Sequence, residues 1–289
     1  MSEEAPSAWA GRRRLFRELH ASGCFVIPNP WDTGAARLLA GLGFRALATT
    51  SSGLAWSMGL QDNHVPLAEA LAHFRAVVRA VALPVSADFE GGFAVEPSAV
   101  AANVKAAIDT GIAGLSIEDS SKDPAAGPLF DFTLAVERVR AARRAIDASG
   151  TGVVLTARSE GFVAGRPDLR ETLRRLSAYA EAGADCLFAP GVRAKADVKA
   201  VVRAVAPRPV NVLVASDFTG VAEVASLGVR RISVGGALAR VAWTAFLEAA
   251  REIADDGRFT RLGRALPGAE VDARFGPDSA QTADRNIKS

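Results

Sequence analysis

Short apolar segments alternate with longer helical segments along most of the chain. Eight runs have the length and the Val, Ile, Leu and Phe content of buried β-strands. Between them, apolar residues recur at helical spacing, and several of these stretches end at a glycine, a common residue at helix C-termini. The predicted strands are residues 24–28, 46–50, 84–89, 114–118, 153–158, 186–190, 209–214 and 231–236. The predicted helices are residues 32–41, 67–82, 97–109, 134–148, 168–182, 194–205, 220–227 and 237–253.

This alternation predicts a single α/β domain with the fold of a (β/α)8 TIM barrel. Strands that are apolar on both faces are typical of a parallel sheet covered by helices, and eight strand–helix units suit a closed barrel. An open doubly wound sheet is the alternative, but no GxGxxG motif follows the first strand. We expect residues 1–255 to form the barrel. The pattern is lost further on, so residues 256–289 are expected to be a tail that is partly disordered or forms an arm onto a neighbouring subunit.

Composition and charge reduce the number of possible functional classes but do not identify the function. The chain has 34 basic and 32 acidic residues, a formal net charge of +2, which gives no reason to expect nucleic acid or a membrane as a partner. No apolar run is long enough to span a membrane and the first residues do not resemble a signal peptide, so we expect a cytoplasmic protein. Cys24 and Cys186 match no metal-ligand spacing and are expected to be buried thiols. His20 and His73 are expected at the surface of helices, and His64 in a turn.

Acidic side chains accumulate where the predicted strands end. The C-terminal ends of barrel strands face the catalytic mouth. Four carboxylates on one rim repel one another unless a cation neutralises them, and hard oxygen ligands suit Mg²⁺. Asp88 and Glu90 are two residues apart on a predicted strand, so both are expected to point to the same side. The candidate metal-binding residues are Asp62, Asp88, Glu90 and Glu118.

Other polar residues at the predicted mouth suit an oxyacid substrate. Arg158 offers a planar fork for a carboxylate or phosphonate, and Glu160 follows it on the same strand end. The Ser51-Ser52-Gly53 turn offers hydroxyl and N–H groups that could cradle the other end of the substrate.

Structural interpretations of these residues stay open at this point. Asp32 and Asp119 could be helix N-caps, and Asp62 could shape the turn that follows it. Asp88 and Glu118 could instead form a structural ion network with Arg158.

Five sequence blocks resemble the phosphoenolpyruvate mutase/isocitrate lyase superfamily, and the resemblance covers roughly residues 12–255. The resemblance implies a (β/α)8 barrel, often with its last helix exchanged between the subunits of a dimer within a tetramer. It also implies Mg²⁺ or Mn²⁺, and cleavage or formation of a C–C or P–C bond of a small 2-oxo acid through a pyruvate enolate. The blocks are SSGLAWSMGLQD (51–62), PVSADFEGGF (84–93), GLSIED (114–119), ARSEGF (157–162) and AYAEAGADCLF (178–188).

The resemblance also implies roles for the candidate residues. Asp88 matches the aspartate that coordinates the metal directly, and Glu90 stands where the family usually has the second Asp of a DxD motif. Asp62 and Glu118 match acidic residues that hold metal-bound waters, and Arg158 matches the arginine that contacts the acid group of the substrate. The loop around Ser51, Ser52 and Gly53 matches the one that binds the pyruvyl group. The expected catalytic residues are therefore Arg158, Glu118 and Asp62.

The loop after the fourth strand departs from the isocitrate-cleaving members. Those enzymes carry a K-[KR]-C-G-H motif whose cysteine transfers a proton, whereas residues 118–132 here contain neither Cys nor His. We therefore expect a lyase, decarboxylase or phosphonomutase rather than a Cys-dependent isocitrate lyase. Lys122 could be the reactive tip of this loop, or a solvated lysine.

Alternatives from other functional classes remain at this level. The chain could be a barrel that binds an oxyacid without turnover, as a sensor or degenerate paralogue. A Schiff-base aldolase would need a strand lysine, and the eight predicted strands contain none. Large apolar residues on the predicted helix 237–253 favour a homo-oligomer, either a dimer or a tetramer.

Overall fold

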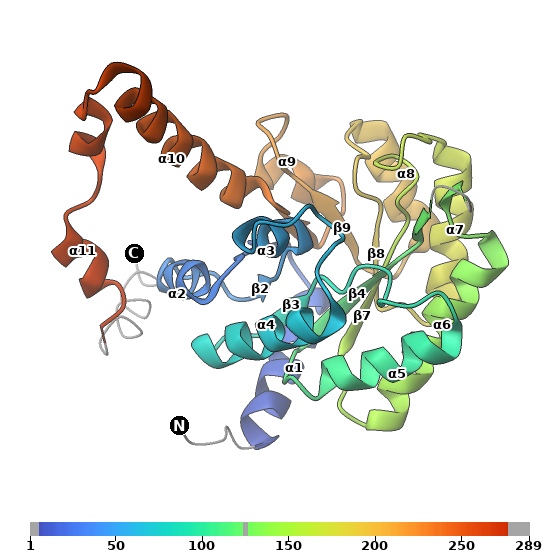
Figure 1. Ribbon diagram of the computed structural model, residues 1–289. Helices are drawn as coiled ribbons and strands as arrows, with labels where there is room; N and C mark the ends of the chain where they lie inside the picture. Colours follow the sequence, from blue (N-terminus) through green and yellow to red (C-terminus); the bar gives the residue numbers. More distant parts are fainter. Residues whose placement is uncertain (1–5, 124–126, 277–289) are drawn as a thin grey trace.

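Eight parallel strands form the centre of the molecule. The computed structural model describes residues 6–123 and 127–276. The Ala48 N–H donates a hydrogen bond to the Pro28 carbonyl (3.1 Å), which links the two strands at the ends of the sheet and leaves a nearly closed barrel. The predicted (β/α)8 fold is thus confirmed, with a strand inside each of the eight predicted ranges (Figure 1). In barrel order the strands are β1 (Phe25–Ile27), β10 (Arg231–Ser233), β9 (Val210–Leu213), β8 (Cys186–Phe188), β7 (Val154–Arg158), β4 (Gly114–Glu118), β3 (Val85–Ala87) and β2 (Leu47–Ala48).

Helices follow the strands and cover the outside of the barrel (Figure 1). Their apolar faces pack on the strands through a continuous buried cluster that includes Leu47, Leu115, Leu155 and Leu187. None of the helices in the described part of the chain is long and apolar enough to cross a membrane. The helices around the barrel are α2 (Thr33–Gly41), α4 (Leu67–Ala80), α5 (Pro97–Ile108), α6 (Phe132–Ser149), α7 (Leu169–Glu181), α8 (Lys195–Val205) and α9 (Val221–Ser226).

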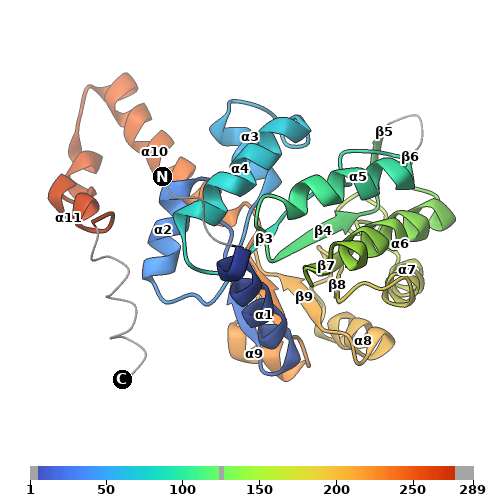
Figure 2. The same cartoon turned by 90° about the horizontal axis from the view of Figure 1, so that it is seen from below.

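An N-terminal helix, α1 (Pro6–Ala21), closes the barrel at the end opposite the predicted mouth (Figure 2). Phe16 and Leu19 of this helix are buried against Phe25 and Ile27 in a separate apolar cluster. Gly114 permits this contact, because a β-carbon there would lie 2.6 Å from the Phe16 ring. The bottom of the barrel is therefore sealed by apolar side chains.

Two elements near the mouth were not predicted. Helix α3 (Ser51–Ser57) stands where a turn was expected, and its N-cap Thr50 accepts the Gly53 N–H. A two-stranded antiparallel hairpin, β5 (Ser120–Asp123) and β6 (Gly127–Leu129), follows β4. Both insertions lie at the C-terminal ends of barrel strands, which is the position of the loops that build active sites in this fold.

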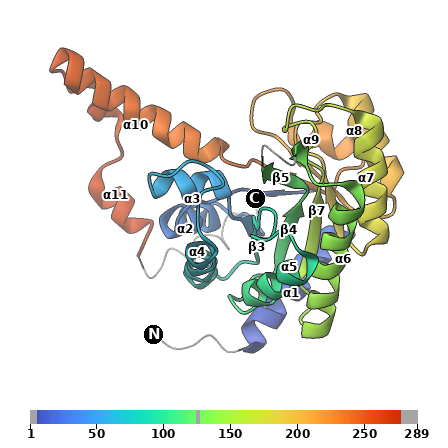
Figure 3. The same ribbon diagram turned by 45° about the vertical axis from the view of Figure 1, so that its right-hand side comes forward.

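The C-terminal segment projects from the barrel. Helix α10 (Ala237–Asp256) leads away from the body, and the short helices η1 (Thr260–Arg264) and α11 (Gly268–Ala273) follow it (Figure 3). The helix pattern therefore continues beyond residue 254, where the sequence had suggested its loss. Residues 277–289 of the predicted tail lie outside the described residues.

Candidate active site

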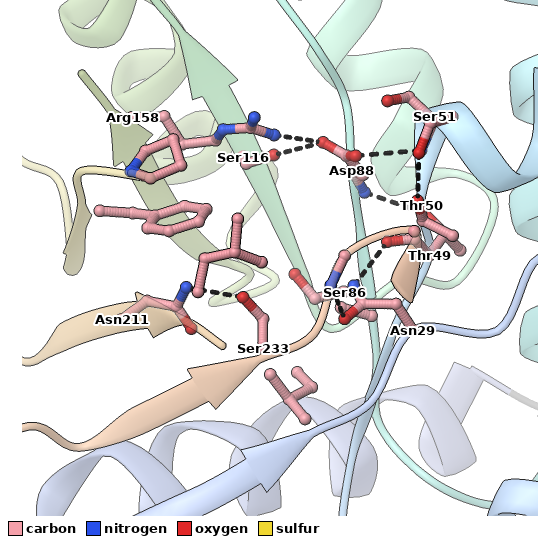
Figure 4. Close-up of a pocket in the computed structure, with 18 of the residues that line it drawn as sticks. Asn29, Thr49, Thr50, Ser51, Ser86, Asp88, Ser116, Arg158, Asn211 and Ser233 are labelled. Carbon is pink, nitrogen blue, oxygen red and sulfur yellow. Dashed lines mark hydrogen bonds and ion pairs between the residues drawn. The ribbon is translucent and has the colours of Figure 1, made fainter. Parts of the chain in front are cut away.

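A polar cavity of about 200 Å³ opens at the C-terminal ends of the strands and reaches into the barrel. Asp88, the first residue after β3, lies at its rim and is held from several elements (Figure 4). Its Oδ1 accepts a hydrogen bond from Arg158 Nη1 (2.6 Å), and its Oδ2 accepts one from the Ser51 N–H (3.0 Å). Its own N–H donates to Thr49 Oγ1 (2.9 Å). The carboxylate of Asp88 is thus fixed in position and faces the cavity.

Arg158, at the end of β7, connects three carboxylates. Besides Asp88, its Nη2 lies 3.3 Å from Glu118 Oε2 and its Nε 2.9 Å from Glu160 Oε1. Burial by itself lowers the pKa of Arg158, but the three carboxylates outweigh burial and raise it well above its usual value. The Phe188 ring also lies near, with its centroid 5.3 Å from the guanidinium carbon. Arg158 is therefore a permanent cation that organises the acidic rim.

Glu90 does not lie on the same side as Asp88, so this expectation was wrong. Strand β3 ends at Ala87, and Glu90 has φ 49°, which breaks the alternation on which the expectation rested. Glu90 lines a neighbouring cavity of about 300 Å³, together with Asn63, Phe93 and Lys122. All four have positive φ, and they are the only such non-glycine residues in the described ranges. Backbone of this kind is uncommon and gathers at functional sites.

Lys122 lines the smaller cavity and pairs with two of the candidate carboxylates. Its Nζ lies 2.5 Å from Glu90 Oε2 and 3.1 Å from Glu118 Oε1. Burial lowers the pKa of Lys122, but the two carboxylates outweigh burial and raise it. Lys122 is thus a paired cation on the hairpin rather than the solvated loop lysine that the sequence allowed.

Asp62 faces the main cavity and also shapes its own turn. Its side chain accepts the Asn63 N–H at 3.0 Å, and it lines the cavity with Ser51 and Asp88. Burial and the nearby Asp88 charge raise the pKa of Asp62. Asp62 therefore shapes its turn and also lines the cavity.

The candidate substrate-binding residues separate into two groups. Ser51 and Ser52 begin helix α3 and line the cavity. Gly53 does not line it: a β-carbon there would lie 2.7 Å from both the Thr50 and the Trp31 side chains, so this glycine allows α3 to pack. Glu160 is also absent from the cavity wall, because it is buried beneath Arg158.

Asp119 is not a helix N-cap, whereas Asp32 caps α2 by accepting the Ala35 N–H. Asp119 is buried behind the rim. One of its oxygens accepts the Glu160 N–H (2.7 Å), and the other accepts Tyr179 Oη (2.7 Å) and Arg175 Nη1 (3.2 Å). This network fixes the backbone that follows Arg158.

The sequence analysis missed the polar residues that β9 and β10 place inside the barrel. Asn29 accepts the Val234 and Gly235 N–H groups (2.9 Å each), and Asn211 Nδ2 donates to Ser233 Oγ (2.9 Å). Asn211, Ser233 and Arg231 line the deep part of the cavity (Figure 4 labels the first two). Polar residues at every second position of otherwise apolar strands could have revealed this polar interior. Barrel interiors are usually filled by branched apolar side chains, so such residues stand out.

The rim carries more negative than positive charge. Burial raises the pKa values of Glu90 and Glu160, that of Glu160 to about 7, and neighbouring carboxylates add to the effect. Within residues 6–123 and 127–276, no three Asp, Glu, His or Cys side chains are arranged to ligate a cation directly. This donor set suits a hard cation that keeps most of its water, as Mg²⁺ does. The carboxylates at or next to the rim are Asp62, Asp88, Glu90, Glu118 and Glu160, and the cations that pair with them are Arg158 and Lys122.

Proteins of known sequence are similar to this chain over most of its length. An uncharacterised protein of Mycobacterium tuberculosis is 34% identical over 262 residues, which cover 90% of this chain and 95% of that protein. An oxaloacetate decarboxylase of Bradyrhizobium diazoefficiens is 28% identical over 205 residues, which cover 68% and 69% of the two chains.

Solved structures agree in fold. A Burkholderia cenocepacia protein provisionally assigned as a lyase/mutase superposes with a TM-score of 0.91 at 45% identity, covering 94% of this chain and 99% of that one. A 2,3-dimethylmalate lyase of the phosphoenolpyruvate mutase/isocitrate lyase superfamily superposes with a TM-score of 0.82 at 26% identity, covering 97% of this chain and 98% of that one. The sequence model of phosphoenolpyruvate phosphomutase matches residues 16–254. The expected family and enzyme class, which processes C–C or P–C bonds, are confirmed: the chain belongs to the phosphoenolpyruvate phosphomutase family within the phosphoenolpyruvate mutase/isocitrate lyase superfamily.

Proposed function

We propose that this protein is a Mg²⁺-dependent enzyme that cleaves or forms a C–C or P–C bond of a small 2-oxo acid through a pyruvate enolate. Relatives named oxaloacetate decarboxylase and 2,3-dimethylmalate lyase support a reaction on a small oxyacid. The observation that carries the proposal is the surplus of carboxylates around the fixed Asp88 at the barrel mouth.

The rim residues would hold the metal in different ways. Asp88 would bind Mg²⁺ directly, because its position is set by Ser51 and Arg158 and it faces the cavity. Asp62 and Glu118 would hold metal-bound water, which Mg²⁺ retains in proteins. When bound, the metal would supply Lewis-acid stabilisation of developing negative charge on the 2-oxo group.

Residues of the chain would orient the substrate. The N-terminal turn of α3 presents the Ser51 and Ser52 side chains to the cavity. Arg158 would place its cationic fork beside the reacting acid group, and its pairing with Glu160 and Glu118 would keep that fork in one orientation. The loop 118–132 contains no thiol or imidazole, so we propose a reaction whose enolate takes its proton from water.

A substrate screen tests this proposal. Oxaloacetate, phosphonopyruvate, 2-methylisocitrate and dimethylmalate are assayed with Mg²⁺ and with EDTA. We expect turnover of at least one 3-substituted 2-oxo acid that EDTA abolishes and Mg²⁺ or Mn²⁺ restores. Cleavage of 2-methylisocitrate should be at least ~10² slower, the usual contribution of a positioned general acid.

The variant Asp88→Ala should remove this activity, because water cannot replace a fixed anionic ligand. Glu137→Ala, which removes an exposed carboxylate on the outer helix α6, is the matched control and should keep it. Full activity in EDTA after dialysis, or wild-type turnover by Asp88→Ala, would contradict the metal assignment. Metal binding without turnover of any 2-oxo acid would favour a barrel that only binds oxyacids.

A further inference from the structure

Arg231 is a buried cation inside the barrel without a carboxylate partner. It is the first residue of β10, is 5% exposed and lines the deep part of the main cavity. Its Nε donates to Asn211 Oδ1 (2.9 Å) and its Nη2 to Thr156 Oγ1 (3.0 Å). Its Nη1 lies 3.3 Å from His20 Nε2. All three partners are neutral groups, and no described carboxylate lies within ion-pair distance of the guanidinium.

The partner on α1 is held as an acceptor. His20 Nδ1 lies 2.7 Å from the Phe16 carbonyl, which accepts its proton, so Nε2 presents its lone pair to Arg231. His20 therefore orients the guanidinium but adds no negative charge. A buried charge is costly unless an opposite charge pairs with it. The deep end of the cavity thus has a fixed cation whose counter-charge the described residues do not supply.

The two arginines of the cavity differ in this respect. Arg158 at the mouth already pairs with Asp88, Glu118 and Glu160. Arg231 at the floor has only hydroxyl, amide and imidazole partners. An anionic group that enters the cavity therefore gains most at the floor.

Further polar groups surround this floor. Ser233 Oγ accepts the Asn211 amide proton, so its own hydroxyl proton can be donated to another acceptor. Ser86 also lines the cavity, whereas the Ser116 hydroxyl donates to Asp88 Oδ1 (3.4 Å). Hydroxyl donors beside a guanidinium form the kind of surface that binds a carboxylate through charge-assisted hydrogen bonds.

We propose that Arg231, together with Asn211 and Ser233, forms a floor subsite that binds the second carboxylate of the substrate. The substrate is then a small dianionic oxyacid that extends from the acidic rim to the floor, which a cavity of about 200 Å³ accommodates. This inference rests on the proposed function, because it assigns the far end of the substrate that the mouth would process.

Calorimetric binding of malonate tests the subsite without turnover. Malonate and propionate have the same number of carbons but two and one carboxylates. Both are titrated into the wild type and into Arg231→Met, with Mg²⁺ and in EDTA. The wild type should bind malonate more tightly than propionate, and Arg231→Met should lose at least ~10-fold in malonate affinity, the scale of a charge-assisted hydrogen bond. Arg230→Met removes the neighbouring arginine, which donates to the Gly23 carbonyl outside the cavity, and should bind malonate normally.

A second variant keeps the test decisive if Arg231→Met does not fold. Asn211→Asp places a carboxylate next to Arg231 Nε and supplies the counter-charge internally. It should raise the Tm of the free protein and abolish the rise in Tm that malonate gives the wild type. Unchanged malonate binding by both variants would overturn the subsite.

Three further outcomes separate this inference from its alternatives. If inorganic phosphate raised the Tm as much as malonate but left the KM for the substrate unchanged, the floor would hold a free ion and the substrate assignment would fail. If a 2-oxo diacid were turned over with the same kcat/KM by the wild type and Arg231→Met, the subsite would be wrong while the proposed function stood. Arg231-dependent malonate binding without turnover of any 2-oxo acid would leave the subsite standing and remove the proposed function.

Discussion

His20 shows how a single side chain can link the bottom of the barrel to its interior. Its ring packs edge-on against Phe16 and Phe25, with ring centroids 4.7 and 5.1 Å away. Burial, and then the Arg231 charge, lower the pKa of His20 from 6.5 to about 3. The expectation that His20 lies at the helix surface was therefore wrong: it was based on helix periodicity alone, which does not show that α1 crosses the barrel end.

This lowered pKa predicts a pH dependence of stability. Between about pH 3 and 6.5 the unfolded chain binds a proton at His20 that the folded chain does not, so stability falls as the pH falls through that window. One group contributes at most about 1.4 kcal/mol per pH unit. His20→Gln, which removes the titration but keeps an acceptor, should flatten the decline in the free energy of unfolding between pH 7 and 5, measured with urea. His64→Gln, at an exposed turn, should not, and equal slopes for wild type and His20→Gln would contradict the assignment.

The sequence revealed the rim residues better than the floor residues. Asp88 and Arg158 follow or end apolar strands, so the position of the mouth in a barrel was enough to locate them. Glu90 was assigned to the wrong side because β3 ends earlier than predicted and the backbone turns at positive φ. Arg231 escaped notice because a charged residue at the start of a strand usually faces solvent, and only the closed barrel shows that it points inward.

At the level of elements, helix α3 depends on one glycine. A β-carbon at Gly53 would meet the Thr50 and Trp31 side chains at 2.7 Å. Gly53→Ala should therefore destabilise the fold by about 1–3 kcal/mol, the usual cost of overpacking. Gly41→Ala, near the end of α2, adds a β-carbon that would meet no atom within 4 Å, so it should be neutral or stabilising by up to about 1 kcal/mol. Urea unfolding of both variants measures the difference, and equal effects would remove the packing role of Gly53.

The strands and outer helices could be predicted because their apolar periodicity is local information. Helix α3 could not, since Ser-Ser-Gly is typical of a turn, and the helix forms only where Thr50 caps it and Trp31 packs on it. The hairpin of β5 and β6 was likewise read as an irregular loop. Its strands are short, β5 is polar and β6 is Gly-Pro-Leu, so neither has the pattern of a buried strand. The Phe130 N–H donates a hydrogen bond to the Asp119 carbonyl and anchors the hairpin. Tertiary contacts, rather than the local sequence pattern, therefore determine whether α3 and the β5–β6 hairpin form.

At the scale of the whole molecule, the barrel and the arm have different surfaces. The barrel buries most of its large apolar residues in two clusters, a large one between strands and outer helices and a smaller one beneath α1. Helix α10 instead leaves Val241, Phe246 and Leu247 exposed, at 67%, 59% and 44% of their surface. Among its residues only Ala239 is fully buried. A projecting helix with an uncovered apolar side favours association with another surface, and the expected homo-oligomer provides one.

We therefore predict that the arm joins copies of this chain. In a twofold interface each apolar side chain is buried twice, so replacing one by a charge should cost about 3–6 kcal/mol per dimer, at least a hundredfold in the dissociation constant. Sedimentation of the wild type at micromolar concentration should show a dimer or tetramer, and Phe246→Asp should shift it to monomer without loss of helical circular dichroism. Val221→Asp, at an exposed apolar position on α9, should leave the oligomer intact. A wild-type monomer, or an equal loss of association in both variants, would show that α10 does not form the contact.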